Sequence, residues 1–320
     1  MSTVGGERVV VLAGGLSHER DVSVRSGRRV AEALRDAGVD VTVLDVDGAL
    51  LPLLAADPPS VVVPLLHGAS GEDGALRDVL GLLGLPYVGS RPAACRVAFD
   101  KPAASTVAGA AGLATPLSVA LPQTTFRELG AGAVMTALLD TLGLPLMVKP
   151  ARGGSSLGAA VVRTAAELPP AMVNCFSYGD TAVVERFVVG TEVAVSIVDT
   201  DGGLMALPGV EIVPDGGFYD YSARYTAGAT EFFSPARLPA DAIVACAEAA
   251  LTAHRALGLA HLSRTDLIVD ADGRPWFLEV NVAPGMTETS LFPQALLAAD
   301  IPLGTLTAEL VEIATGLSST

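Results

Sequence analysis

The sequence has few cysteines and no long apolar run. Its three cysteines, Cys95, Cys175 and Cys246, lie far apart, and an odd number at no motif spacing argues against a disulfide framework or a zinc site. We expect them to be buried as small hydrophobic side chains. No run reaches the roughly 18 apolar residues that a membrane span needs, and the N-terminal residues lack the apolar stretch of a signal peptide. These absences predict a cytoplasmic protein that does not enter a membrane.

Positive charge is also scarce. There are 20 Lys and Arg residues against 35 Asp and Glu, which gives a formal net charge of −15. A field of that sign repels nucleic acid, so we expect no nucleic-acid partner. The chain has only two lysines, Lys101 and Lys149, and every other strong base is arginine. A lysine in a chain that otherwise uses arginine favours a function that needs a compact point charge, such as phosphate binding. The alternative is that both lysines lie on the surface and have no function.

The length and the pattern predict an α/β protein built from three units. The chain has 320 residues, of which 50% are hydrophobic, enough for two or three domains with sizeable cores. Strand patterns alternate with helix patterns over residues 1–90, which predicts a parallel sheet. Residues 91–188 mix Ala-rich helices with short strands, and residues 189–320 contain further strands and a long helix.

The first unit does not match a dinucleotide-binding fold. The strand at residues 9–12 ends at Gly14-Gly15, but the G-x-G-x-x-G spacing is absent. Functional loops in parallel sheets sit at the carboxyl ends of the strands. Two loops are expected there, at residues 14–19 and 67–74.

A lysine followed by a Gly/Ser turn forms the first chemical motif, over residues 148–158. Glycines let the backbone approach an anion, turn amides form anion-binding nests, and Lys149 adds a point charge. It is not a Walker loop, because the lysine precedes the glycines. We expect residues 146–148 and 159–162 to pair on either side of the turn. An ordinary flexible hairpin is the alternative.

Acids on two predicted strands form the second motif. Alternation places Arg264 and Asp266 on one face of a strand, and Glu279 and Asn281 on one face of another. Pairing in register would bring the three oxygen-bearing side chains together, and such ligands suit Mg²⁺. Two edge strands with solvated acids are the alternative, although acids among apolar neighbours are costly to bury unpaired.

A third stretch, residues 183–192, could hold an adenine and a ribose, or be an amphipathic strand end.

Together these stretches resemble the D-alanine–D-alanine ligase family over residues 8 to about 312. The specific matches are His67-Gly68-x-x-Gly71-Glu72-Asp73-Gly74, Pro86-Tyr87-Val88-Gly89-Ser90, Val148-Lys149-Pro150 through Gly154-Ser155-Ser156, Phe218-Tyr219-Asp220-Tyr221, and Leu278-Glu279-Val280-Asn281 with Pro284-Gly285-Met286-Thr287. The resemblance implies an ATP-grasp fold with ATP between the second and third units. It also implies a homodimer that synthesises D-alanyl-D-alanine for peptidoglycan and the cell wall.

The resemblance implies a role for each matching residue. Nucleotide ligands would be Lys101, Lys149, Gly154, Ser155, Ser156, Glu185, Arg186, Phe187, Val188 and Glu192. Ligands of two Mg²⁺ ions, or of Mn²⁺, would be Asp266, Glu279 and Asn281. Amino-acid binding and catalysis would use Glu19, His67, Ser155, Tyr225, Arg264, Gly285, Ser290 and Leu291.

The sequence also departs from the family pattern. Arg77 stands where glutamine is usual, Arg186 and Arg224 replace lysines, Val282-Ala283 replaces Thr and a small residue, and Thr289 replaces a histidine. These departures leave open a ligase with a different second D-amino acid or hydroxy acid. A non-catalytic nucleotide-binding homologue is a separate alternative, and the intact Lys101, Lys149, Asp266, Glu279 and Asn281 count against it.

Overall fold

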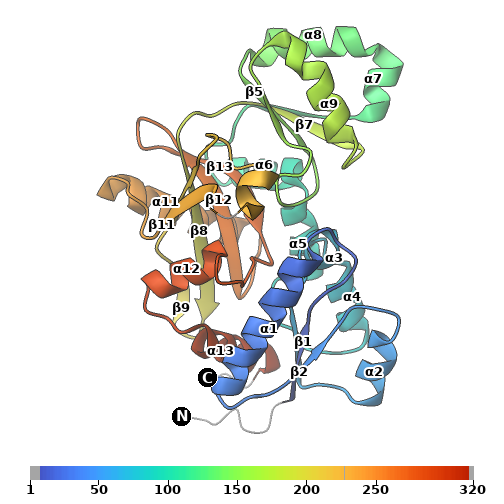
Figure 1. Ribbon diagram of the computed structural model, residues 1–320, viewed down its shortest axis with the longest axis vertical. Coiled ribbons are helices and arrows are strands. Elements are labelled where there is room, and N and C mark those ends of the chain that lie inside the picture. Colours follow the sequence, from blue (N-terminus) through green and yellow to red (C-terminus); the bar gives the residue numbers. More distant parts are fainter. Residues whose placement is uncertain (1–7, 227, 317–320) are drawn as a thin grey trace.

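The computed structural model describes residues 8–226 and 228–316. Its three sheets follow one another along the long axis of the molecule. The sheet of the central part of the chain lies at one end, the N-terminal sheet at the other, and the C-terminal sheet between them (Figure 1).

The N-terminal sheet is parallel, as the alternating pattern predicted. Its strands β1 (Arg8–Leu12), β2 (Asp40–Leu44) and β3 (Val61–Pro64) lie in the order β2-β1-β3. β1 is central, and its β-branched side chains are buried on both faces, as strands of a covered parallel sheet must be. The helices are α1 (Arg20–Asp36), α2 (Leu50–Ala56), α3 (Ala69–Glu72) and α4 (Ala75–Leu82).

The central sheet is antiparallel, in the order β4-β7-β5-β6. Its elements are β4 (Ser118–Pro122), α7 (Gln123–Leu129), α8 (Ala131–Leu142), β5 (Leu146–Pro150), β6 (Ala160–Val162), a 3₁₀ turn (Ala165–Glu167), α9 (Leu168–Phe176) and β7 (Thr181–Arg186). The predicted pairing across the Gly/Ser turn is confirmed, because Leu146 faces Val162 in the β5–β6 ladder. α8 and α9 share a core with alternate residues of β5, which leaves Met147 and Lys149 on the other face.

The C-terminal sheet has the order β11-β10-β8-β12-β13, with β9 paired to β8. Its elements are β8 (Thr191–Thr200), β9 (Gly203–Ala206), β10 (Val210–Pro214), α10 (Tyr221–Tyr225), β11 (Thr230–Phe233), α11 (Ala240–Ala256), β12 (Leu262–Val269), β13 (Pro275–Asn281), α12 (Leu291–Ala298) and α13 (Leu303–Thr315). The short helix α10 lies in a stretch rich in Gly, Tyr and Ala, and Asp220 caps it by accepting a bond from the Ala223 amide.

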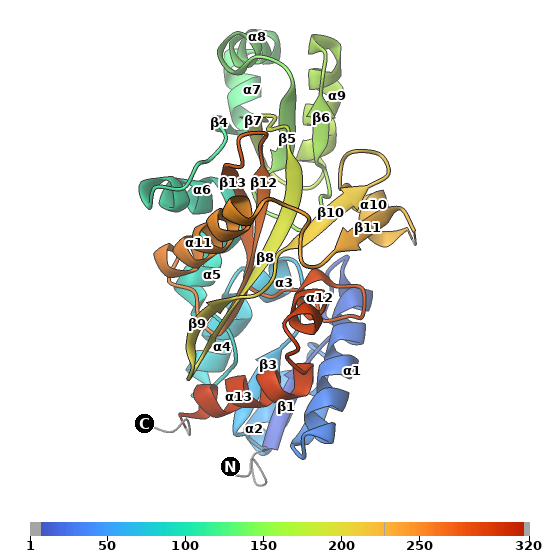
Figure 2. The ribbon, with the colours of Figure 1, turned by 90° about the vertical axis from the view of Figure 1, so that its left-hand side faces the viewer.

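Helices from other parts of the chain pack against the C-terminal sheet. α5 (Pro92–Phe99) and α6 (Lys101–Ala110) follow the N-terminal sheet in the chain, but they share a core with β8, β13 and α11. At the other end of the chain, Leu306 and Leu310 of α13 pack in one core with Val30 and Leu34 of α1. The predicted division at residues 90/91 and 188/189 stays a prediction. Figure 2 shows α13 beside α1.

Two expectations from composition can be compared with the structure. All three cysteines are free and buried, as predicted. Within residues 8–226 and 228–316, no helix is both long enough and apolar enough to cross a membrane.

Candidate active site

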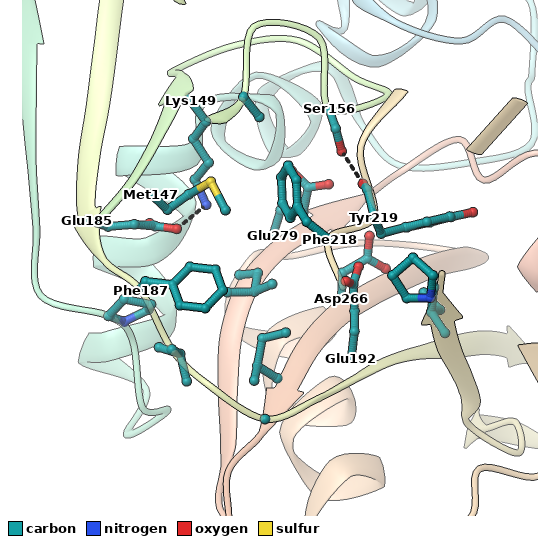
Figure 3. Close-up of a pocket in the computed structure, with 18 of the residues that line it drawn as sticks. Met147, Lys149, Ser156, Glu185, Phe187, Glu192, Phe218, Tyr219, Asp266 and Glu279 are labelled. Carbon is teal, nitrogen blue, oxygen red and sulfur yellow. Dashed lines mark hydrogen bonds and ion pairs between the residues drawn. The ribbon is translucent and has the colours of Figure 1, made fainter. Parts of the chain in front are cut away.

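Two adjoining cavities hold nearly all of the residues predicted to act. The first, of about 460 Å³, lies between the central and C-terminal sheets (Figure 3), and the second, of about 590 Å³, lies between the C-terminal sheet and the N-terminal unit. Lys101, Gly153, Gly154, Arg224 and Glu279 line both, so the two cavities meet at these residues.

The structure places the predicted residues as follows. The first cavity is lined by Lys101, Lys149, Gly154, Ser156, Glu185, Arg186, Phe187, Val188, Glu192, Asp266 and Glu279. The second is lined by Glu19, His67, Lys101, Gly154, Ser155, Arg264, Glu279, Asn281, Gly285, Ser290 and Leu291. Tyr225 belongs to α10, but its side chain lies outside the described part of the chain, so its predicted role is not tested.

An ion pair lies at one end of the first cavity. Met147 faces Glu185 across the β5–β7 ladder, and Lys149 follows two residues later on the same face. The Lys149 ammonium therefore reaches Glu185 diagonally, with Nζ 2.7 Å from Oε1 (Figure 3). Met147, Phe187, Ile268 and Leu278 line the same cavity, and such apolar walls suit a flat ring.

The Gly/Ser turn closes over the junction of the two cavities. Ser155 and Ser156 both have positive φ, 52° and 56°, which non-glycine residues rarely adopt. The Ser155 hydroxyl donates to Glu19, and the Ser156 hydroxyl donates to the Tyr219 carbonyl at 3.0 Å. The Lys101 ammonium donates to the Gly153 carbonyl at 2.7 Å. These contacts compensate the strained backbone, which typically persists only where the surroundings enforce it.

Residues 218–224 lie against this turn. Arg224 donates from Nε to the Ser156 hydroxyl at 3.2 Å, and its guanidinium stacks on the Tyr219 ring, 4.2 Å from the centroid. Both a planar guanidinium and a donor at Nε are needed for this pair of contacts, and lysine has neither. Arg224, which stands where the family usually has lysine, therefore holds residues 218–224 to the Gly/Ser turn.

The predicted convergence on β12 and β13 is confirmed. Asp266 pairs with Glu279, and Arg264 with Asn281, so all four side chains share one face of the sheet. Arg264 holds Asp266 through two bonds of 2.7 Å, and Lys101 lies 3.2 Å from Glu279. Burial by itself raises the pKa of Glu279, but Lys101 and Lys149 outweigh it and hold that pKa at about 2. The carboxylate of Glu279 is therefore charged at neutral pH.

This face fits a divalent cation. Two carboxylates and the Asn281 amide oxygen offer hard oxygen ligands on neighbouring strands, beside a cavity with room for phosphates. Asn281 Oδ1 accepts a bond from the Ala283 amide at 2.7 Å, which orients its oxygen. Among the described residues, no three His, Cys, Asp or Glu side chains form a metal-binding group by themselves.

Arg264, Gly285 and Ser290 lie together in the second cavity. A Cβ at position 285 would lie 2.7 Å from the Ser290 hydroxyl, so a larger residue there would displace that hydroxyl. Ser290 precedes α12, and its hydroxyl accepts a bond from the Thr287 amide at 3.1 Å. The first amides of a helix attract anions, so the Leu291 amide and the Ser290 hydroxyl offer a site for a carboxylate.

Three titratable groups in the walls of the cavities have shifted pKa values that the sequence did not reveal. Burial raises the pKa of Glu72 to about 8, and the nearby Glu19 carboxylate adds to the shift. Burial also raises the pKa of Glu192 to about 7. The pKa of His67 is lowered, chiefly by burial. Glu72 stands in the quoted 67–74 motif, but only its place in the second cavity suggests a role.

Two sheets enclosing a nucleotide-sized cavity, with lysines beside a pair of strand carboxylates, define an ATP-grasp enzyme. Comparisons with known proteins agree and are more specific. A family model described as D-ala D-ala ligase C-terminus matches residues 107–312. The chain belongs to the D-alanine–D-alanine ligase family.

Relatives and solved structures cover nearly the whole chain. A D-alanine–D-alanine ligase of Anaeromyxobacter sp. (strain K) is 44% identical, over 92% of each chain. The Gloeobacter violaceus ligase is 42% identical, over 92% of this chain and 95% of that one. The D-alanine–D-alanine ligase structure from Bacillus anthracis has a TM-score of 0.82 and 30% identity, over 98% of each chain. The VanG D-Ala:D-Ser ligase from Enterococcus faecalis has a TM-score of 0.83 and 27% identity, over 96% of this chain and 99% of that one.

Proposed function

We propose that this enzyme uses ATP to join two D-alanine molecules through an acyl phosphate, for peptidoglycan synthesis. The observation that carries the proposal is the junction of the two cavities. Lys101 and Glu279 line both, so a phosphate bound in the first cavity would meet a carboxylate bound in the second. The family relatives, which share at least 36% identity in the cited matches, support the same activity.

The first cavity holds the nucleotide in this proposal. Phe187 and Val188 contact the adenine, Glu185 accepts from its amino group, and Glu192 binds the ribose. Lys101 and Lys149 neutralise the phosphates, under amides of the turn that contains Gly154, Ser155 and Ser156. A related structure, from Bacillus anthracis, is described as complexed with ATP.

Asp266, Glu279 and Asn281 would hold two Mg²⁺ ions against the phosphates, with Mn²⁺ as a substitute. The metal supplies neutralisation of negative charge while the phosphoryl group moves. In the structure Arg264 and Lys101 neutralise these carboxylates. Lys101, which pairs with Glu279 in the structure, would be available to a phosphate when a cation neutralises that carboxylate.

The second cavity holds the two amino acids. Glu19 would bind the ammonium group of the first one, with His67 in the wall nearby. Its carboxylate attacks the γ-phosphorus, ADP leaves, and an acyl phosphate with a good leaving group forms. Ser290 and the Leu291 amide hold the carboxylate of the second molecule, and its free amine then attacks the carbonyl carbon. Arg264 and the Gly285 N–H stabilise the oxyanion. Collapse of this intermediate expels phosphate, and loss of a proton from the nitrogen completes the amide.

Closure of the site keeps water from the acyl phosphate. The bond from Ser155 to Glu19 ties the turn to the first amino-acid site. Arg224 ties residues 218–224 to the same turn. From the family resemblance we propose that Tyr225 extends this chain of bonds, and that the enzyme is a cytoplasmic homodimer, which light scattering would test.

A ligase with a different second substrate is the second candidate. Thr289, which replaces a usual histidine, lines the second cavity next to Ser290, and the similar VanG structure is named a D-Ala:D-Ser ligase. ADP release and product mass, measured with D-alanine, D-serine and D-lactate in competition at neutral pH, test both. We expect D-alanyl-D-alanine to predominate. Predominant D-serine dipeptide or D-lactate ester would contradict the assignment, and absence of ADP release with every substrate would indicate a non-catalytic homologue.

A further inference from the structure

Side chains of the N-terminal unit hold the loop that joins β13 to α12. The loop includes residues 283–287, and Gly285 stands in its middle. His67 Nδ1 lies 2.9 Å from the Ala283 carbonyl oxygen, and the Met286 amide donates to the Ser26 hydroxyl at 3.0 Å. Ser26 is fully buried and lies 3.2 Å from His67 Nε2. The loop is thus bonded on both sides of Gly285.

The chemistry of each hydrogen-bonding partner determines which atom donates and which accepts in the bonds of His67 and Ser26. A carbonyl oxygen only accepts, so His67 Nδ1 carries a proton and donates to Ala283. In the neutral ring Nε2 is then an acceptor, and the Ser26 hydroxyl donates to it while accepting from the Met286 amide. Burial favours the neutral ring. Both ring nitrogens of His67 are therefore engaged within the protein.

Arg29, on the same face of α1 as Ser26, holds the part of the loop that follows Gly285. Arg29 donates from Nη1 to the Met286 carbonyl at 3.1 Å and to the Thr287 carbonyl at 2.8 Å. Ser26 and Arg29 are three residues apart on α1 and so share a face. Val22, one turn earlier, would lie 3.8 Å from a Cβ at position 285. Figure 2 shows α1 beside α12, to which the loop leads.

We propose that Ser26, His67 and Arg29 are positioning residues for the second half of the reaction, in which the amine attacks the acyl phosphate. The proposal rests on the proposed function, in which the Gly285 N–H binds the oxyanion. These three side chains fix the loop that carries this amide and leads to Ser290. Among the described residues, Lys149 and Asp266, which are assigned to phosphoryl transfer, pair with Glu185 and Arg264 rather than with these three side chains.

The Ser26→Ala variant tests this separation. It leaves the Met286 amide and His67 Nε2 without their partner, so we expect kcat/KM for the second D-alanine to fall about 10-fold, which corresponds to about 1.4 kcal/mol. Transfer of the γ-phosphoryl group is followed by scrambling of ¹⁸O from the β,γ-bridge of ATP. We expect this rate to stay within about 2-fold of that of the unmodified enzyme. Equal losses in both measurements would overturn the proposal, because a merely structural role lowers both.

A double-mutant cycle tests whether Ser26 and His67 act as one unit. His67→Asn can retain a donor toward Ala283 but loses the acceptor for Ser26. The two substitutions break the same bond, so the double variant should be no slower than the slower single variant within about 2-fold. Multiplying effects would instead show that His67 contacts substrate independently, which would overturn its positioning role.

Arg29→Ala gives a test that does not depend on a fully buried side chain. Arg28 is its matched control, because it is exposed on α1 and makes no hydrogen bond or ion pair with the described residues. We expect Arg29→Ala to raise the KM for the second D-alanine while ATP scrambling is retained, and Arg28→Ala to change neither. Equal behaviour of the two variants contradicts the proposal. Lack of any dipeptide from the unmodified enzyme would instead refute the proposed function.

Discussion

Replacing Glu185 with glutamine removes the negative partner of Lys149 while keeping the shape of the side chain. The Lys149 and Glu185 side chains are only 12% and 9% exposed, and Nζ and Oε1 are 2.7 Å apart. Removing one partner of a buried ion pair leaves an uncompensated charge and typically costs 3–5 kcal/mol. Because glutamine still accepts a hydrogen bond, we expect the lower end, about 3 kcal/mol.

The assay is thermal unfolding with a surface pair as control. For a chain of this size, 1 kcal/mol corresponds to about 2 °C, so Glu185→Gln should lower Tm by about 6 °C. Arg96 and Asp78 also form an ion pair, but their side chains are 54% and 50% exposed. An exposed pair contributes at most about 1 kcal/mol, so Asp78→Asn should lower Tm by less than about 2 °C.

Inorganic triphosphate with Mg²⁺ completes the experiment, because it supplies negative charge to Lys149 without the adenine that Glu185 is proposed to bind. We expect it to raise the Tm of Glu185→Gln more than that of the unmodified protein. Equal Tm losses in Glu185→Gln and Asp78→Asn, or equal stabilisation by triphosphate, would refute the reasoning that Lys149 is a buried phosphate ligand whose charge Glu185 balances.

Three further outcomes follow. Glu279→Gln keeps the shape but removes the charge of a proposed metal ligand, so turnover at saturating Mg²⁺ should fall by orders of magnitude. The circular dichroism spectrum should not change, because the fold is retained. Normal turnover would exclude Glu279 as a metal ligand. Lys149→Ala should raise the KM for ATP, whereas Arg35→Ala, on an exposed part of α1, should not; equal small effects would mean that Lys149 binds no phosphate. Burial lowers the pKa of His254 from 6.5 to about 4, so between these pH values the unfolded chain binds the extra proton and stability should fall by about 3 kcal/mol on acidification. Plots of Tm against pH should be shallower for His254→Gln, and parallel plots would contradict this.

Local patterns predicted the strands of the site. Alternation placed Arg264 and Asp266 on one face of a strand, and Glu279 and Asn281 on one face of another, since side chains in a strand alternate with a period of two. Their convergence depended on the register, which the structure supplies. The β5–β6 pairing also followed from sequence, because only the Gly/Ser turn separates the two strand patterns. These features depend on residues that are near one another in the chain or on a strict period.

Packing between distant segments could not be predicted in this way. An apolar helix face shows that a helix is buried, but not which surface covers it. The pairing of α13 with α1 and the placement of α6 under the C-terminal sheet are examples. The bond between Ser26 and Met286 joins residues 260 positions apart, and a lone buried serine gives no pattern that reveals such a partner.

The two lysines have a consequence for chemical modification. Their side chains are only 13% and 12% exposed, and both line the first cavity. Reagents that acylate side-chain amines have no other lysine to modify anywhere in the sequence. Each acyl group detected on a lysine by mass spectrometry therefore reports access to that cavity. Occupancy by a nucleotide would appear as protection of two defined peptides, without any engineered label.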